Sequence, residues 1–121
     1  MNKLTEKEEQ IMKMLWARGP MFVREMLDLY PEPKPHFNTV STFVRLMEQK
    51  GFVGHEAFGN SHRYFPLIAE AYYSRSALKS VIARYFNNSM RSVVSALVSD
   101  EKLTPDELRK LIDQVERGEE E

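Results

Sequence analysis

The sequence predicts a mainly α-helical protein: a winged helix-turn-helix, made of three helices and a small β-hairpin wing, followed by C-terminal dimerisation helices. Three observations support this fold class. Apolar residues recur at helical spacing, turn-rich stretches separate these segments, and an aromatic-rich stretch around Gly59-Asn60-Ser61 has the composition of a β-hairpin. We assign residues 1–67 to a winged helix-turn-helix DNA-binding domain and residues 68–121 to a helical dimerisation region.

The composition is that of an ordinary globular protein and excludes several kinds of site. Of the 121 residues, 42% are hydrophobic and 29% are charged, and none is cysteine. Disulfides, thiolate metal sites and cysteine nucleophiles are therefore excluded. No apolar run approaches the ~18 residues of a membrane span, and the first ten residues lack the apolar core of a signal peptide. We expect a protein of the reducing cytoplasm.

Two helices are expected first. Thr5 and Glu8 have the spacing of a capping box, and Gly19-Pro20 combines a residue suited to a helix C-terminus with one that prevents continuation. After a short strand at residues 21–23, a short second helix follows from the helical spacing of Val23, Met26, Leu27 and Tyr30. The alternating prolines of residues 31–35 end it, which gives the element order of a helix-turn-helix.

The third helix is expected within residues 36–51, and its two faces differ in chemistry. One face is apolar at positions i, i+3, i+4 and i+7: Val40, Phe43, Val44 and Met47. The other side carries groups that can hydrogen-bond to base edges or phosphates: Asn38, Thr39, Ser41, Thr42, Arg45 and Gln49. An apolar back and a short polar front predict a recognition helix.

A plain solvated surface is the alternative interpretation of this polar face. Serine and threonine form helices less readily than the Glu, Lys and Ala that usually fill an exposed face. Their cluster also lies in the first turns, the part of a recognition helix that reaches base edges. Both observations favour contact with bases or phosphates, most strongly at Thr42 and Arg45.

The wing is expected from residues 52–58 and 62–65, the aromatic-rich segments on either side of the glycine-containing tip. His62 and Arg63 follow the tip, where a wing would meet a phosphate or a minor groove. A solvated hairpin with charges there by chance is the alternative. Because a two-stranded ribbon is marginally stable alone, we expect it to pack on the helices.

Three amphipathic helices are expected after the wing. The first ends at Asn87-Asn88, Ser89 caps the second, and Thr104, Pro105 and Glu107 supply the cap, first turn and capping box of the third. Their apolar stripes could fold back onto the same subunit or pack against a second copy. We expect a homodimer, which matches palindromic DNA half-sites, through Leu78, Ile82, Tyr85, Val93, Val94, Leu97, Leu108, Leu111, Ile112 and Val115.

No motif of an enzyme or metal site occurs in the sequence. His36, His55 and His62 lack the helical spacing of metal ligands, and no cysteine can complete a tetrahedral site. No glycine-rich phosphate loop, nucleophile elbow or acidic cluster beside a nucleophile is found. We expect the acidic residues mostly on helix caps and polar faces. We therefore expect no catalysis, no metal, no cofactor and no small-molecule substrate.

The net charge of −1 leaves two classes of function open. Residues 1–68 carry +1 and residues 69–121 carry −2, whereas a nonspecific DNA-coating protein is strongly basic. DNA binding would therefore depend on a few local cations, duplicated by dimerisation. The alternative is a winged-helix interaction module that binds protein and has no DNA role.

Three segments of the chain resemble the penicillinase repressor family (BlaI, MecI and the copper-responsive CopY relatives). They are residues 4–16, LTEKEEQIMKMLW, residues 38–53, NTVSTFVRLMEQKGFV, and residues 103–116, LTPDELRKLIDQVE. The most specific part is the T-V-x-T segment at residues 39–42, followed by Lys50-Gly51. The resemblance implies a dimeric winged-helix repressor of palindromic operators. Its DNA-contacting residues would be Thr39, Ser41, Thr42 and Arg45, with His62 and Arg63 in the wing.

The resemblance also implies a partner and a mode of release. In this family, a membrane sensor with a cytoplasm-facing metalloprotease domain triggers repressor cleavage in the penultimate helix. The family's Asn-Phe cleavage pair corresponds here to Ala96-Leu97, and the arginine that many members carry at Leu46 stands at Arg45. Neither the cleavage bond nor the operator sequence therefore transfers directly. The cysteine cluster of the copper branch is absent, which excludes copper sensing.

Overall fold

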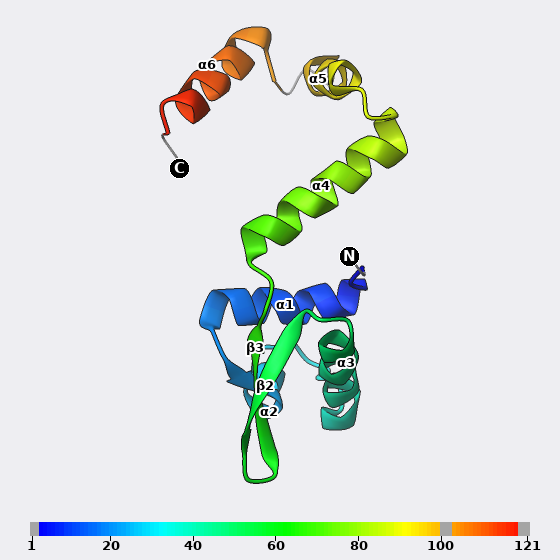
Figure 1. The fold of residues 1–121 in the computed structure, drawn as a ribbon, viewed down its shortest axis with the longest axis vertical. Coiled ribbons are helices and arrows are strands. Elements are labelled where there is room, and N and C mark those ends of the chain that lie inside the picture. Colours follow the sequence, from blue (N-terminus) through cyan, green and yellow to red (C-terminus); the bar gives the residue numbers. More distant parts are fainter. Residues whose placement is uncertain (1–2, 100–102, 119–121) are drawn as a thin grey trace. The chain divides into compact units, whose positions relative to one another are not determined.

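The chain runs through three helices, a hairpin wing and three further helices (Figure 1). The computed structural model describes residues 3–99 and 103–118, which form six helices and a three-stranded antiparallel sheet. The winged-helix fold class is confirmed, and dimerisation by the last helices stays a prediction. The elements are α1 Glu6–Arg18, β1 Met21–Phe22, α2 Val23–Asp28, α3 Phe37–Gln49, β2 Val53–Phe58, β3 Ser61–Pro66, α4 Glu70–Phe86, α5 Met90–Ser99 and α6 Pro105–Glu116.

The chain divides into two compact units, Met1–Tyr73 and Ser74–Glu121. The division lies within the first turns of α4, shortly after the boundary at residue 67 that the sequence suggested. Tyr73 explains this position, because its hydroxyl donates to Glu9 Oε2 at 2.7 Å and its ring packs 5.8 Å from the ring of Trp16. Burial and the bond to Glu9 raise the pKa of Tyr73 to about 12. The start of α4 is therefore part of the first unit.

The first helix begins and ends where the sequence predicted. The Glu8 N–H donates to Thr5 Oγ1 at 3.2 Å, and the Thr5 N–H donates to Glu8 Oε1 at 2.9 Å, which completes the capping box. Gly19 follows the helix with a φ of 82°, a conformation that suits glycine. The apolar face of α1 is buried in the core at Ile11, Met12 and Leu15.

The wing belongs to a sheet with the order β1-β3-β2. β3 pairs with β1 through Met21↔Tyr64 and Phe22↔Arg63, and with β2 from Val53↔Pro66 to Phe58↔Ser61. The tip therefore consists of Gly59-Asn60 alone, and Ser61 belongs to the strand. Phe52, Val53 and Tyr64 at the base of the hairpin are buried, so the hairpin packs on the helices as expected.

The second unit contains no buried side chain in its described helices. Its helix ends nevertheless follow the predicted signals. α4 ends at Phe86, directly before Asn87 and Asn88, whose φ values of 50° and 62° stop the helix. The Ser92 N–H donates to Ser89 Oγ at 3.1 Å in the first turn of α5. The capping box predicted before α6 is formed by Thr104 and Glu107, with bonds of 2.9 and 3.1 Å. The helices are locally well defined but form no core of their own.

Candidate nucleic-acid interface

The two faces of α3 differ as predicted. Val40, Val44 and Met47 are 0% exposed, and Phe43 packs partly buried against the same core. On the other side, Ser41 is half-buried and the remaining predicted DNA-binding residues are exposed: Asn38, Thr39, Thr42, Arg45 and Gln49. The apolar face of α3 thus packs in the core and its hydrogen-bonding face lies in solvent, which is the arrangement that a groove-binding helix requires.

Thr42 is hydrogen-bonded to two other predicted residues on this face, Asn38 and Arg45. Its Oγ1 donates to the carbonyl oxygen of Asn38 at 2.9 Å and accepts from Nη2 of Arg45 at 3.2 Å. A hydroxyl can donate and accept at once, so the two bonds do not compete. Thr42 therefore holds the Arg45 guanidinium over the exposed face, and that guanidinium has further N–H groups for a ligand.

The two wing residues have different surroundings. The His62 ring stacks on the His55 ring, with centroids 4.1 Å apart and planes 11° apart, and His62 lines the same cavity as Ser41 and Arg45 of α3. Arg63 is the next residue along β3, so it points to the opposite face of the strand. The structure therefore brings His62 together with the recognition helix but not Arg63.

Two carboxylates near the wing were missed by the sequence analysis. Glu56 Oε1 accepts from Arg63 Nη2 at 2.9 Å, and Glu48 Oε2 lies 2.8 Å from His55 Nδ1, which links α3 to β2. Glu56 and Arg63 are direct cross-strand partners, so the register of a hairpin with a two-residue tip would have predicted their pairing. Glu56 offsets the charge of Arg63 on the wing, in keeping with the near-neutral chain.

A partly buried ion pair between Lys50 and Glu8, also missed from the sequence, joins the end of α3 to the start of α1. Glu8 is 2% exposed, and its Oε1 accepts from Lys50 Nζ at 2.7 Å, while the same ammonium donates to the Lys3 carbonyl oxygen at 3.2 Å. Burial alone disfavours the carboxylate, but the Lys50 ammonium and the Thr5 N–H outweigh it and lower the pKa of Glu8. Glu8 is thus more than a helix cap, since it fixes α3 against α1.

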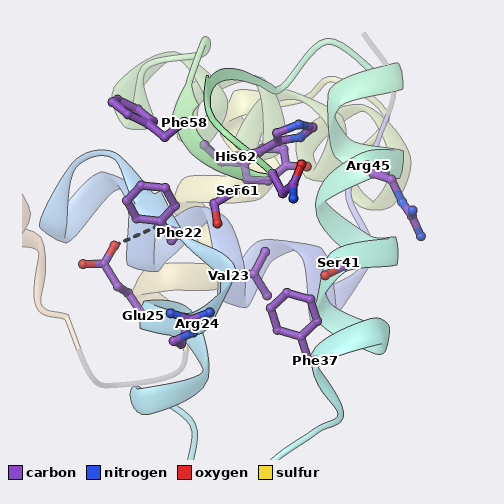
Figure 2. Close-up of a pocket in the computed structure, with 12 residues that line it drawn as sticks. Phe22, Val23, Arg24, Glu25, Phe37, Ser41, Arg45, Phe58, Ser61 and His62 are labelled. Carbon is purple, nitrogen blue, oxygen red and sulfur yellow. Dashed lines mark hydrogen bonds between the residues drawn. The ribbon is translucent and has the colours of Figure 1, made fainter.

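A cavity of about 630 Å³ lies between the start of α2, the first half of α3 and the wing (Figure 2). Three of its lining residues, Ser41, Arg45 and His62, were predicted to bind DNA. Three phenylalanines share the lining with them: Phe22, Phe37 and Phe58. The aromatic residues around this cavity were not recognised as a site in the sequence, because the tertiary fold brings together segments that are far apart in the chain.

The residues predicted to dimerise lie on α4, α5 and α6 with much of their apolar surface in solvent. Ile82, Val93 and Leu108 are half-buried. The others are between 41% and 75% exposed: Leu78, Tyr85, Val94, Leu97, Leu111, Ile112 and Val115. Ala96 and Leu97, which correspond to the family's cleavage pair, both lie exposed within α5.

Residues 3–99 and 103–118 contain neither a metal-binding cluster nor a membrane-spanning helix. No group of three or more His, Cys, Asp or Glu residues is placed to hold a metal ion there. No helix in those ranges is long and apolar enough to cross a membrane. His55 and His62 instead form the stacked pair of the wing, and His36 precedes α3.

Comparison with known proteins gives one family and two relatives. The family model described as penicillinase repressor matches residues 4–117. A penicillinase repressor of Bacillus licheniformis is 23% identical over 110 residues, which cover 90% of this chain and 86% of that protein. An uncharacterized 16.5 kDa protein in the ptsI 3′ region of Latilactobacillus sakei is 23% identical over 112 residues, 91% of this chain and 76% of that protein.

Proposed function

Because the chain belongs to the penicillinase repressor family, a family of transcriptional repressors, we propose that it binds operator DNA as a homodimer and represses transcription. Each subunit inserts α3 into a major groove, and the wing touches the neighbouring sugar-phosphate backbone. The operators are palindromic, with half-sites about one helical turn apart, because a two-fold dimer presents its two recognition helices symmetrically. The protein acts in the cytoplasm.

The observation that carries this proposal is the exposed row of hydrogen-bonding groups on α3. Asn38, Thr42 and Arg45 are linked by two hydrogen bonds, so the Arg45 guanidinium is supported before any ligand arrives. A supported guanidinium suits the bidentate contact that arginine makes to guanine O6 and N7. The fully buried back of the helix and the Glu8–Lys50 pair keep this row in a fixed orientation.

In the wing, phosphate contact requires an exchange of partners at Arg63. Its guanidinium is bound to Glu56 and lies 4.9 Å from the Phe58 ring centroid, so a phosphate must compete with that carboxylate. His62 carries no such ion pair among the described residues and lies on the side that faces α3. His62 is therefore the wing residue with the more direct access to the backbone of DNA bound by α3.

The apolar stripes of α4 to α6 support the homodimer. Large hydrophobic side chains that are half exposed on consecutive helices are typical of an interaction surface. A second copy of the same helices offers an equivalent apolar surface, and a two-fold interface is self-complementary. Joining two half-sites through one dimer makes the second DNA contact effectively intramolecular, so loss of the dimer would be sufficient for release.

Proteolysis is the route of release that the family resemblance suggests, with a membrane sensor-protease as the partner. The Ala96–Leu97 bond is exposed but lies within α5, so a protease would need that helix to open locally. Intact-mass measurement of the repressor from induced cells tests this route. Fragments ending at Ala96 would support it, and derepression with only full-length chain would exclude it.

The experiment that tests the main proposal is selection of duplex DNA from a random pool by the purified protein at moderate salt. We expect a two-fold symmetric consensus with half-sites about one helical turn apart. Affinity for the selected duplex should fall steeply as salt is raised, because phosphate contacts release counterions. A folded protein that enriches no sequence and has no duplex affinity at low salt would favour the protein-interaction module instead.

A further inference from the structure

We propose that the cavity between α2, α3 and the wing binds a small organic anion that carries an aromatic ring, and that this ligand excludes operator DNA. Binding of the ligand is independent of the proposed repressor function, whereas the competition with DNA rests on it. Both parts follow from the lining of the cavity: its aromatic rings, its two arginines, Arg24 and Arg45, and its overlap with the recognition helix (Figure 2).

The aromatic rings are not explained by DNA binding. Phe37 and Phe58 are 50% and 47% exposed, and a phosphate backbone is contacted by cations and hydrogen-bond donors rather than by phenyl rings. Phe58 is also held in place, since its ring meets the Phe22 ring edge-on at 5.7 Å and 67°. An ordered aromatic surface left in solvent is typical of a site for an apolar group.

The cavity has the size and composition of a small-molecule site. Its volume of about 630 Å³ lies within the range of roughly 300–1,000 Å³ that such sites occupy. Figure 2 shows Phe37 and Arg24 on one side of it and Phe58 on the other, with Phe22 between them. A planar aromatic ring in the cavity can therefore pack against these phenyl rings while its polar substituent faces Arg24.

The charges around the cavity favour an anionic substituent. Arg24 has no described ion pair or hydrogen bond within residues 3–99 and 103–118, and it is exposed at the edge of the cavity. The neighbouring Glu25 is engaged instead by the Phe22 N–H, which donates to its Oε1 at 2.8 Å. A carboxylate on the ligand would form an ion pair with the Arg24 guanidinium, whereas a neutral or cationic ligand would not.

Overlap with the recognition helix makes the ligand a competitor of DNA. Ser41, Arg45 and His62 line the cavity and are also proposed DNA contacts. A molecule seated among them occupies the concave space between helix and wing through which the DNA backbone would pass. By linkage, an anion that lowers the affinity for DNA must itself bind less tightly to the DNA complex, by the same factor.

The first test is a nuclear magnetic resonance titration of the full-length ¹⁵N-labelled protein, without DNA, using 2-naphthoate. We expect saturable shifts confined to amides of residues 22–25, 37–45 and 58–64, which include every lining residue, and binding of the neutral analogue 2-naphthylmethanol at least about fivefold weaker. Arg24→Gln should weaken naphthoate by a similar factor and leave the alcohol unchanged, and Arg18→Gln, at an exposed position ending α1, is the matched control. No saturable shift at these residues, or equal affinity for acid and alcohol, would overturn the site.

The second test is competition at constant ionic strength with the duplex obtained by selection, with acetate as the control anion. Naphthoate should weaken DNA binding in the wild type, and Arg24→Gln should need about fivefold more naphthoate for the same loss, while acetate should have no effect. Naphthoate binding with unchanged DNA affinity would overturn the competition. If the protein binds no duplex at all, the proposed function and the competition both fail, and the ligand site is decided by the titration alone.

Discussion

Helices α1 and α6 have the same local sequence features but differ in how much of their apolar surface is buried. Each begins with a threonine-glutamate capping box and carries one apolar stripe. In α1 the stripe is 0% exposed at Ile11, Met12 and Leu15, whereas in α6 Leu111, Ile112 and Val115 are 43%, 51% and 75% exposed. Local sequence signals therefore specify a helix and its apolar face, and the rest of the fold decides whether that face is covered.

This difference indicates that the apolar helix faces of the two units are covered in different ways. The first unit covers its stripes with its own helices and the base of the wing, so its stability is a property of one chain. The stripes of α4 to α6 have no such cover among the described residues, so their stability should depend on protein concentration if a second copy supplies it.

The largest expected effect is in the core of the first unit. Phe52→Ala removes a 0% exposed aromatic side chain and should lower the free energy of unfolding by about 3–5 kcal/mol. Hydrogen exchange of the α1 and α3 amides measures this loss. Ile112→Ala is the matched change in the second unit and should alter protection in α1 and α3 by less than about 0.5 kcal/mol. Equal effects of both variants would contradict the division into independent units.

The next effect is on assembly. Leu111→Glu places a charge in the stripe of α6, and each dimer contains the change twice by symmetry. Because burying one leucine side chain contributes about 1.5–3 kcal/mol, the dimer dissociation constant should rise at least about 100-fold. Sedimentation equilibrium measures it, and Arg109→Glu on the same helix is an exposed control. A monomeric wild type at micromolar concentration would contradict the homodimer.

Removal of the Lys50 ammonium should destabilise the first unit by about 1–3 kcal/mol, because Lys50→Met leaves the buried Glu8 carboxylate without its cation. The pKa of Glu8 is lowered from 4.5 in the folded chain, so the pair stabilises the wild type above that pH and less as the pH falls through the folded value. The difference between wild type and Lys50→Met should therefore shrink below pH 4.5.

Urea denaturation at pH 7 and pH 3 measures this dependence on pH. Lys13→Met, at an exposed position of α1, is the control and should have little effect at either pH. A stability difference between wild type and Lys50→Met that grows as the pH falls would show that the pair does not stabilise the ionised carboxylate.

A substitution in α3 of the first unit should weaken DNA binding and leave dimerisation by the second unit unchanged. Arg45→Ala should weaken binding to the selected operator by about 1–3 kcal/mol if the guanidinium contacts a guanine, without changing the dimer. Fluorescence anisotropy with a labelled duplex measures it. Unchanged affinity for the best operator would show that Arg45 contacts no base.

The smallest expected effect is at Thr42. Thr42→Val removes the hydroxyl that accepts from Arg45 and should cost about 0.5–1.5 kcal/mol of DNA affinity, while Thr42→Ser keeps the hydroxyl and should retain most of the affinity. The same anisotropy assay compares the two variants. Equal losses in both would mean that the methyl group of Thr42, not its hydroxyl, matters for binding.

The features predicted correctly from the sequence are those that depend on residues close together in the chain. The Thr5–Glu8 and Thr104–Glu107 boxes, the end of α1 at Gly19 and the two faces of α3 all follow from spacings within one or two turns. The hairpin tip was placed to within one residue, because Ser61 can occupy either a turn or a strand and only the pairing with Phe58 decides.

The features that escaped prediction join distant segments. Lys50 lies 42 residues from Glu8, and nothing in the local pattern of either residue distinguishes it from a solvated surface charge. The cavity likewise combines α2, α3 and the wing, so its three phenylalanines look like separate core residues in the sequence. Which residues of the candidate interface contact DNA stays a prediction for the experiments above.

Trp16 joins the two ends of the first unit. Its Nε1–H donates to the Ile68 carbonyl oxygen at 2.9 Å, and its ring packs against Tyr73 in the first turn of α4. The chain contains a single tryptophan, so its intrinsic fluorescence arises from this one place. If the start of α4 detached, water would replace the carbonyl and the neighbouring ring, and the emission would shift to longer wavelength. The intrinsic fluorescence of Trp16 is thus an optical probe that reports, without any label, when the start of α4 detaches from α1.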